Sequence, residues 1–215
     1  MTNLPHHEPR WPALVAALAA AGLSLALPRG LTLGPPWLFP VITATLLVPT
    51  MIMHRLGRHE LDRAFGFTVT SVVTIELVAS VIRLVTALPS RRESPTWLLL
   101  SAAAIWTSNV LVFALWYWRL DAGGPHGRDR RGNHIAGAFL FPQMTMLPDA
   151  KKDAGQSTWS PNFLDYLFLA FNTSTAFSPT DTPALARWGK MLMMLQSIIS
   201  LTVLAILAAR AVNIL

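Results

Sequence analysis

The polar residues best suited to chemistry gather near the C-terminal end, in a stretch between two apolar segments. It begins at Asn172 and ends at Asp181, and between them lie Thr173, Ser174, Thr175, Ala176, Phe177, Ser178, Pro179 and Thr180. Hydroxyl and carboxylate oxygens are suited to contact with cations. On the apolar segment that follows, three polar residues recur at helical spacing and are expected to line the same face: Gln196, Ser197 and Ser200. The pattern favours ion contact over covalent chemistry.

Two charged residues, Glu76 and Arg83, interrupt an earlier apolar segment. Charges inside a membrane are costly, so such residues are usually paired or functional. Their spacing puts them on one helical face but about 10 Å apart along the axis, too far for easy contact. We therefore expect partners from other helices, with Asn109 as a candidate for Glu76. Glu76 is expected either in a structural pair or in gating or proton sensing.

The sequence gives little indication of a disulfide, a metal site, a nucleotide or nucleic-acid site, or a catalytic site. The chain has no cysteine, which excludes disulfides and thiolate chemistry. Its six histidines lie in polar loops without the spacing of a metal site, so no metal and no cofactor is expected. No nucleotide-binding loop or catalytic grouping is evident. The basic run at 128–131 lacks interleaved aromatic residues, which argues against nucleic acid. We expect no enzyme.

The elements that position the polar stretch are predicted to be helices in lipid. Of the 215 residues, 53% are apolar and only 13% charged, about half the charged share of an ordinary soluble domain. The mean hydropathy is +0.44. The excess of 17 Lys and Arg over 11 Asp and Glu suits loops that face anionic lipid headgroups. We predict an all-α, multi-pass integral membrane protein whose partner is the lipid bilayer.

The apolar runs predict about five transmembrane helices. Residues 1–10 form a polar N-terminus, 11–118 hold four spans, 119–160 form an extramembrane loop and 161–215 hold the polar stretch with its flanking helices. The predicted spans are 11–27, 37–53, 65–88, 96–118 and 188–214, the first two forming an antiparallel hairpin. An apolar island at 136–146 is too short to cross, so we expect it in the interface or packed on another segment.

Residues 161–173 predict a half-helix, with Ser160 as its N-cap and Pro161 at its first position. At about 1.5 Å per residue it is about 20 Å long, too short to span a bilayer. The polar, proline-containing residues 174–183 follow before the final span. Together these segments predict a re-entrant loop. Non-helical backbone at membrane depth is tolerated only where protein or a water-filled cavity surrounds it, so the loop should line something.

This polar stretch, followed by Arg187-Trp188-Gly189-Lys190, resembles the pore loop of tetrameric potassium channels. The resemblance covers residues 163–215, with the span at 96–118 in place of the outer helix. It sets Thr173 and Thr175 on the family's two threonines and Asp181 on the acidic residue that closes the filter. Asn172 stands where some members have a pore-helix glutamate. The resemblance implies a homotetramer, with a pathway for cations.

The filter itself departs from the family. Where potassium channels have Gly-Tyr-Gly, this chain has Ser178-Pro179-Thr180. The family's ladder of carbonyls needs conformations that only glycine tolerates, and proline fixes φ and lacks an N–H. Potassium selectivity is therefore not predicted. We expect a wider, partly hydrated pathway lined by the hydroxyls of Thr173, Thr175, Ser178 and Thr180. A ring of four Asp181 carboxylates would favour cations.

The charge distribution conflicts with the usual orientation of such loops. Most of the 17 basic residues fall on one predicted side, namely Arg10, Arg55, Arg58, Arg63, Arg119, Arg128, Arg130, Arg131, Lys151, Lys152, Arg187 and Lys190. The positive-inside rule makes that side cytoplasmic, so the loop would enter from the cytoplasm. Potassium-channel loops enter from outside. Three alternatives therefore stay open: one apolar segment does not cross, the pore-loop architecture is inverted, or the resemblance is misleading.

Two functions therefore remain open from the sequence. The first is a homotetrameric, cation-permeable channel of the bacterial inner membrane that passes monovalent cations without potassium selectivity. The second is a non-conducting membrane scaffold or accessory subunit, in which the polar stretch packs at an oligomer interface. Residues 164–182 and 209–214 also resemble a group of small bacterial membrane proteins without an established activity, which does not separate the two.

Overall fold

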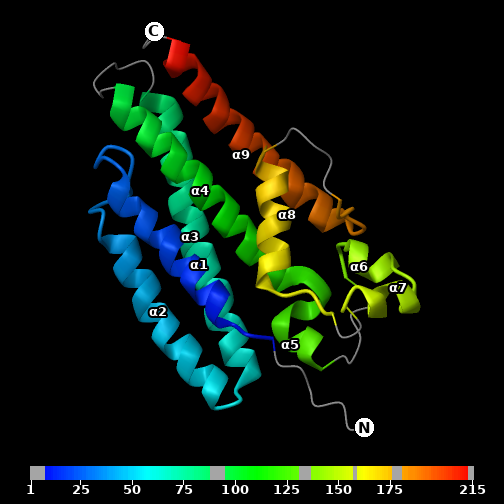
Figure 1. Cartoon of the computed structure of the whole chain (residues 1–215). Coiled ribbons are helices and arrows are strands. Elements are labelled where there is room, and N and C mark those ends of the chain that lie inside the picture. Colours follow the sequence, from blue (N-terminus) through cyan, green and yellow to red (C-terminus); the bar gives the residue numbers. More distant parts are fainter. Residues whose placement is uncertain (1–7, 88–94, 131–136, 157–158, 176–180, 213–215) are drawn as a thin grey trace.

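The structure is a computed structural model that describes residues 8–87, 95–130, 137–156, 159–175 and 181–212 (Figure 1). Every regular element in these ranges is a helix, which confirms the all-α prediction. Four of the described helices are long and apolar enough to cross a membrane: α2 (Leu38–Arg55), α3 (His59–Ala87), α4 (Pro95–Leu120) and α9 (Arg187–Val212). The first apolar segment forms the shorter α1 (Trp11–Gly22), continued by the 3₁₀ turn η1 (Leu23–Ala26).

Helix α1 packs closely on the bundle because one of its faces is made of alanine. The buried members of that face recur at helical spacing and are Ala13, Ala16, Ala17, Ala20 and Ala21. Small residues let two helix backbones approach, which is the usual way that apolar helices pack in lipid. In this way α1 reaches both α4 and α2.

The hairpin of α1 and α2 is tied to α3 at both ends. A tight turn at Gly57, with φ of +66°, joins α2 to α3, a conformation that glycine adopts readily. At one end, Arg10 forms an ion pair with Asp62 at 2.6 Å. At the other, Arg83 donates a hydrogen bond to the carbonyl of Thr32. Since Asp62 and Arg83 are 21 residues apart on α3, the tied length is about 31 Å.

Helix α4 is the centre of the bundle and contacts α1, α3, α8 (Phe163–Thr175) and α9 (Figure 1). Its chain then reverses through η3 (Asp121–Gly123), where Ala122, Gly123 and Gly124 have positive φ, into the short α5 (Gly124–Asp129). The reversal lets the buried Arg128 donate to the carbonyls of Trp118 and Asp121 at 2.9 and 3.0 Å. These bonds satisfy carbonyl groups that the end of α4 leaves without a helical partner.

The apolar island at 136–146 packs on other segments, which is one of the two positions expected for it. Phe139 is fully buried, with its ring 5.1 Å from Tyr117, 6.5 Å from Tyr166 and 5.8 Å from Trp188, centroid to centroid. The buried Asp121 adds polar ties, because its carboxylate accepts from the backbone N–H of Ala138 at 2.5 Å and from the hydroxyl of Tyr166 at 2.6 Å. The short helices α6 (Pro142–Thr145) and α7 (Pro148–Asp153) follow the island.

The half-helix forms as α8, but its cap differs from the prediction. Ser160 is not the N-cap, because α8 begins two residues after the predicted Pro161. Asn162 accepts a hydrogen bond from the N–H of Leu164 at 2.8 Å, and Asp165 accepts from the N–H of Asn162 at 2.8 Å. These two bonds make Asn162 the N-cap of α8, with its side chain bonded to the second residue of the helix. The helix also continues two residues beyond the predicted end, to Thr175.

After α8 the chain returns toward the end at which α8 began. Leu185 donates to the carbonyl of Ala138 at 2.7 Å, and Leu140 donates to that of Pro183 at 3.0 Å. The segment before α9 is thus paired with the same island that holds the N-terminal half of α8. Helix α9 then runs along α8 past its C-terminal end toward the opposite end of the bundle (Figure 1). Helix α4, the half-helix α8 and α9 form one packed unit.

Candidate functional site

The predicted polar residues of α9 face inward, where they bind α8. Gln196 is fully buried, and its Nε2 donates to the Ala170 carbonyl and to Ser174 Oγ, both at 2.7 Å. Its Oε1 accepts from the Tyr117 hydroxyl on α4 at 2.5 Å. The equally buried Ser200 donates to the Ser174 carbonyl and accepts from the Trp106 ring N–H at 2.9 Å. We call the polar contacts among α4, α8 and α9 the α8 network.

Two further residues complete the α8 network. Asn109 is fully buried on α4 and donates to the Gln196 carbonyl at 3.2 Å and to Ser174 Oγ at 3.5 Å. The prediction that Asn109 pairs with Glu76 is wrong, because its amide N–H group faces α8 and α9. Ser197 is partly exposed and donates to the Thr173 carbonyl at 3.3 Å. The α8 network therefore fixes the last turn of α8 within a single chain.

The predicted pore-type residues fall in three places. Thr173 and Ser174 are buried in the last turn of α8, and Thr173 donates to the Leu169 carbonyl at 2.8 Å. Asn172 and Thr175 are partly exposed, with Thr175 donating to the Asn172 carbonyl at 2.8 Å. Asp181 is exposed, on the segment that returns to the island. The predicted residues Ala176, Phe177, Ser178, Pro179 and Thr180 lie outside the described part of the chain.

Glu76 and Arg83 are separated on α3 in the way that their spacing indicates. Arg83 is engaged with the Thr32 carbonyl, and among the described residues it forms no ion pair with Glu76. Glu76 is buried and lines a small cavity between α1, η1, α3 and α4, whose polar lining includes Ser24, Ser80 and Ser108. The partner group for Arg83 thus comes from the connection between α1 and α2.

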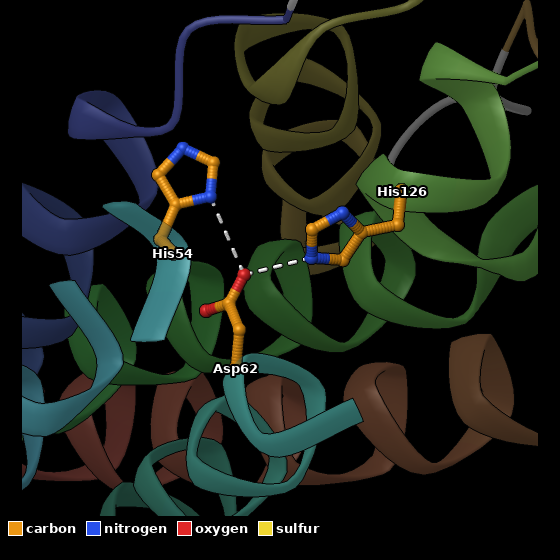
Figure 2. A group of neighbouring side chains, drawn as sticks. All are labelled: His54, Asp62 and His126. Carbon is orange, nitrogen blue, oxygen red and sulfur yellow. Dashed lines mark hydrogen bonds and ion pairs between the residues drawn. The ribbon is translucent and has the colours of Figure 1, made fainter. Parts of the chain in front are cut away.

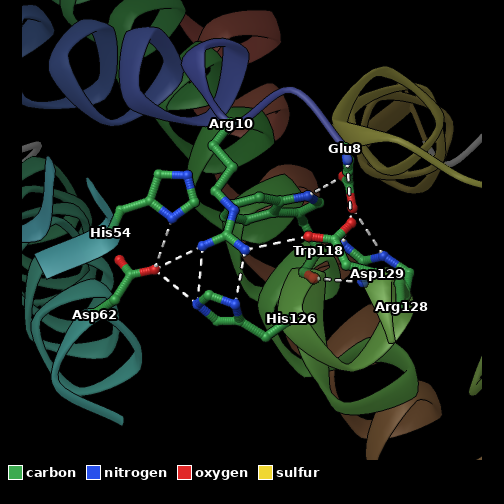
Figure 3. A network of polar contacts seen from close by, with 8 residues as sticks. All are labelled: Glu8, Arg10, His54, Asp62, Trp118, His126, Arg128 and Asp129. Atoms are coloured by element: carbon green, nitrogen blue, oxygen red, sulfur yellow. Dashed lines mark hydrogen bonds and ion pairs between the residues drawn. The ribbon is translucent and has the colours of Figure 1, made fainter. Parts of the chain in front are cut away.

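A second polar cluster, which sequence reasoning missed, ties the N-terminal segment to α5 (Figure 3). Glu8 accepts from Arg128 at 2.9 and 3.0 Å and from the ring N–H of Trp118. The Glu8 backbone N–H donates to Asp129 at 3.1 Å. Burial raises the pKa of the Glu8 carboxyl, although Arg128 and Trp118 both act to lower it. The Glu8 carboxylate therefore anchors the segment before α1 to the C-terminal end of α4 and to α5.

The same cluster brings His54, Asp62 and His126 together, with ligand-type atoms within 4.8 Å of one another (Figure 2). Asp62 Oδ2 lies 2.7 Å from His126 Nε2 and 3.5 Å from His54 Nδ1. We call these three residues the histidine–aspartate group. Their residue types suit a divalent transition metal. Nothing in their spacing signals the group, because α2, α3 and α5 each supply one member.

An arginine already occupies the position that a metal would need. The Arg10 guanidinium lies 2.6 Å from Asp62 Oδ2 and 2.8 and 2.9 Å from the two ring nitrogens of His126 (Figure 3). A fixed positive charge at this distance repels a cation and uses the same lone pairs. With Arg10 in place, the histidine–aspartate group therefore acts as a polar tie that joins the N-terminal segment to α2, α3 and α5, not as a metal centre.

Comparison with known proteins adds no further guide to either cluster, since no family model, no curated protein and no solved structure matches this chain.

Proposed function

We propose that this chain is the subunit of a homotetrameric pore-loop channel in the cell inner membrane, permeable to monovalent cations and not selective for potassium. The observation that carries the proposal is the path of the chain around α8. A half-helix leaves one end of the bundle, stops partway, and is followed by a segment that returns to the island at the starting end. Helix α4 precedes the half-helix in the place of an outer helix, and α9 follows it in the place of an inner helix. This is the order of elements in a pore-loop channel.

The dimensions of the bundle suit a multi-pass membrane protein. The hairpin of α1 and α2 is tied to α3 over about 31 Å, close to the hydrocarbon thickness of a bilayer. Helix α1 with η1 therefore accompanies the four longer helices through most of the bilayer. The exposed face of α9 is apolar, formed by Met191, Met194, Leu195, Ile198 and Leu201, as expected for contact with lipid or another subunit.

Asp181 supplies the selectivity in this proposal. It is exposed on a single chain, so its carboxylate is free to face a symmetry axis. Four such carboxylates around an axis would concentrate cations and exclude anions. Thr175, partly exposed at the end of α8, is the last hydroxyl-bearing residue before Asp181 that the structure describes. Because Gln196 and Ser200 are used within the chain, the proposal assigns them to holding α8 in place.

The proposed orientation follows the positive-inside rule. Contacts among Glu8, Arg10, Asp62, His126 and Arg128 gather several of the basic segments at the end where α8 begins. Placing this end in the cytoplasm makes the half-helix enter from inside, opposite to a potassium channel.

The α8 network favours a second candidate, a non-conducting scaffold or accessory subunit. Its members Asn109, Ser174, Gln196 and Ser200 are already fully buried in the single chain, where the described residues supply hydrogen-bond partners for them. A half-helix fixed in this way can also serve as a rigid surface for subunit packing.

Cation flux into liposomes that hold the purified full chain separates the two candidates. The channel proposal expects potassium and sodium flux without chloride flux, reduced at least severalfold by Asp181→Asn. Asp153→Asn is the matched control, since Asp153 is an exposed carboxylate on α7, in the extramembrane loop. Absence of flux in the parent chain would favour the scaffold, and equal flux in both variants would remove the role of Asp181.

A further inference from the structure

A cavity lies between α1, α3 and the turn from α4 to α5. It is at the end of the bundle where Glu8, Arg10 and Arg128 form their contacts, which we call the polar end. The cavity is small and partly open to the surroundings. Its charged lining consists of Arg10, Arg63, Arg119 and Asp62, and its apolar lining includes Leu14, Phe67 and Trp118. An apolar wall with a few convergent polar groups is the usual composition of a ligand site.

Arg119 has hydrogen-bonding capacity in this cavity that the described residues leave unused. Its Nε donates to Thr70 Oγ1 at 2.7 Å. Gly66 provides the space for its head, because a Cβ at that position would lie 1.9 Å from Nη1. Within the described residues, neither Nη1 nor Nη2 of Arg119 forms a hydrogen bond. The guanidinium therefore presents the two-nitrogen fork that matches a carboxylate or phosphate.

The charge balance of the cavity favours an anion. Arg10 is neutralised by Asp62 at 2.6 Å, whereas Arg119 and Arg63 have no ion pair among the described residues. The Arg63 guanidinium lies over the Phe67 ring, 5.7 Å from its centroid, at the mouth of the same cavity. An ionised group that leaves water is stabilised only when a counter-charge replaces the lost hydration. The lining thus carries a positive excess beside an apolar wall.

We propose that this cavity binds the phosphate group of an anionic membrane lipid. Arg119 holds two phosphate oxygens through Nη1 and Nη2, and Arg63 supplies the second positive charge. Leu14, Phe67 and Trp118 contact the glycerol and the first carbons of the acyl chains. This apolar contact is what distinguishes a lipid phosphate from free phosphate in the same position. The site is separate from the α8 network and does not depend on conduction.

Isothermal titration of the purified full chain in detergent tests the proposal. The probes are a short-chain phosphatidylglycerol, the phosphatidylcholine of the same chain length, and inorganic phosphate at matched ionic strength. We expect the phosphatidylglycerol to bind more tightly than the other two. Arg119→Gln should weaken its binding by about tenfold or more, since charge-assisted hydrogen bonds are lost. Arg63→Gln should weaken it severalfold.

Arg58→Gln is the matched control, because Arg58 is exposed at the same end of the molecule and does not line the cavity. Arg58→Gln should bind phosphatidylglycerol as tightly as the parent chain does. Binding by Arg119→Gln at parental strength would overturn the proposal, as would an equal loss in Arg58→Gln. If inorganic phosphate binds as tightly as phosphatidylglycerol, the proposal that the bound phosphate group belongs to a lipid is overturned. Since Arg63 is exposed, Arg63→Gln keeps the test decisive even if Arg119→Gln does not fold.

Discussion

Replacing Gln196 by leucine tests whether the α8 network holds the half-helix in place. The substitution removes three hydrogen bonds, to Ala170, Ser174 and Tyr117, from a site with no exposure. At about 0.6 kcal/mol for each bond inside a membrane protein, their loss amounts to about 2 kcal/mol. The Tyr117 hydroxyl is left buried without this partner, which adds about 1–3 kcal/mol. We expect unfolding to become easier by about 3–5 kcal/mol.

Two measurements follow this change in the same protein. Unfolding by a denaturing detergent in mixed micelles gives the free energy of the parent, Gln196→Leu, Tyr117→Phe and the double variant. Removing both partners also removes the unsatisfied hydroxyl, so the double variant should lose about 1–3 kcal/mol less than the sum of the single losses. Because the chain has no cysteine, Thr175→Cys gives a single thiol at the end of α8. Its maleimide labelling should be faster when Gln196 is leucine.

A change in the free energy of unfolding of less than about 1 kcal/mol in Gln196→Leu, together with an unchanged labelling rate, would refute this role of the α8 network. Strict additivity of the two substitutions would also contradict it, because it would mean that Tyr117 and Gln196 do not act on each other. Thr68→Val serves as the control, since Thr68 lies exposed on α3 and its hydroxyl contacts only its own helix at Ala64.

Three further predictions concern the polar end of the bundle. Gly66→Ala should destabilise the fold by about 1–3 kcal/mol, because the added methyl group displaces the Arg119 guanidinium. Gly22→Ala should stabilise it by about 0.5–1 kcal/mol, because Gly22 has free space around it and a φ of −65°. Thermal unfolding of both variants shows whether the two changes have opposite signs. Arg10→Met should let the histidine–aspartate group bind Zn²⁺, seen as a melting temperature that Zn²⁺ raises in the variant and leaves unchanged in the parent. Since burial raises the pKa of Glu8, its protonated form is favoured by folding, so stability falls as the pH rises through that raised pKa. Glu8→Gln should remove this part of the pH dependence, and a melting profile that keeps it would contradict the assignment.

The helices of this chain were largely predictable because its long helices are apolar over most of their length. The apolar runs located the long helices to within a few residues, apart from α3, which starts earlier, at His59. That start is polar, with Glu60 and Asp62 in its first turn, so it carries no hydropathy signal. The N-cap of α8 was missed for a related reason. Ser160 and Asn162 are both good caps, and Asn162 is distinguished by the bond that it accepts from Leu164 and the bond that its N–H donates to Asp165.

The side-chain clusters were less predictable, because they depend on contacts between distant parts of the chain. The helical spacing of Gln196 and Ser200 correctly indicated one shared face, but not that this face meets α8 and α4 within the same chain. The histidine–aspartate group assembles from three helices, and Arg10 enters it from the N-terminal segment. Hydropathy and spacing describe one helix at a time, so they do not show which helices meet.

The most direct test of cation conduction is a recording of ionic current in planar bilayers with Asp181→Cys. The parent chain has no cysteine, so charged thiol reagents react at this position alone. We predict potassium and sodium currents for the parent and reduced currents for Asp181→Cys. A positively charged reagent should reduce the variant's current further, and a negatively charged one should restore it. Absence of current in the parent, or currents that neither reagent alters, would contradict a pore at Asp181.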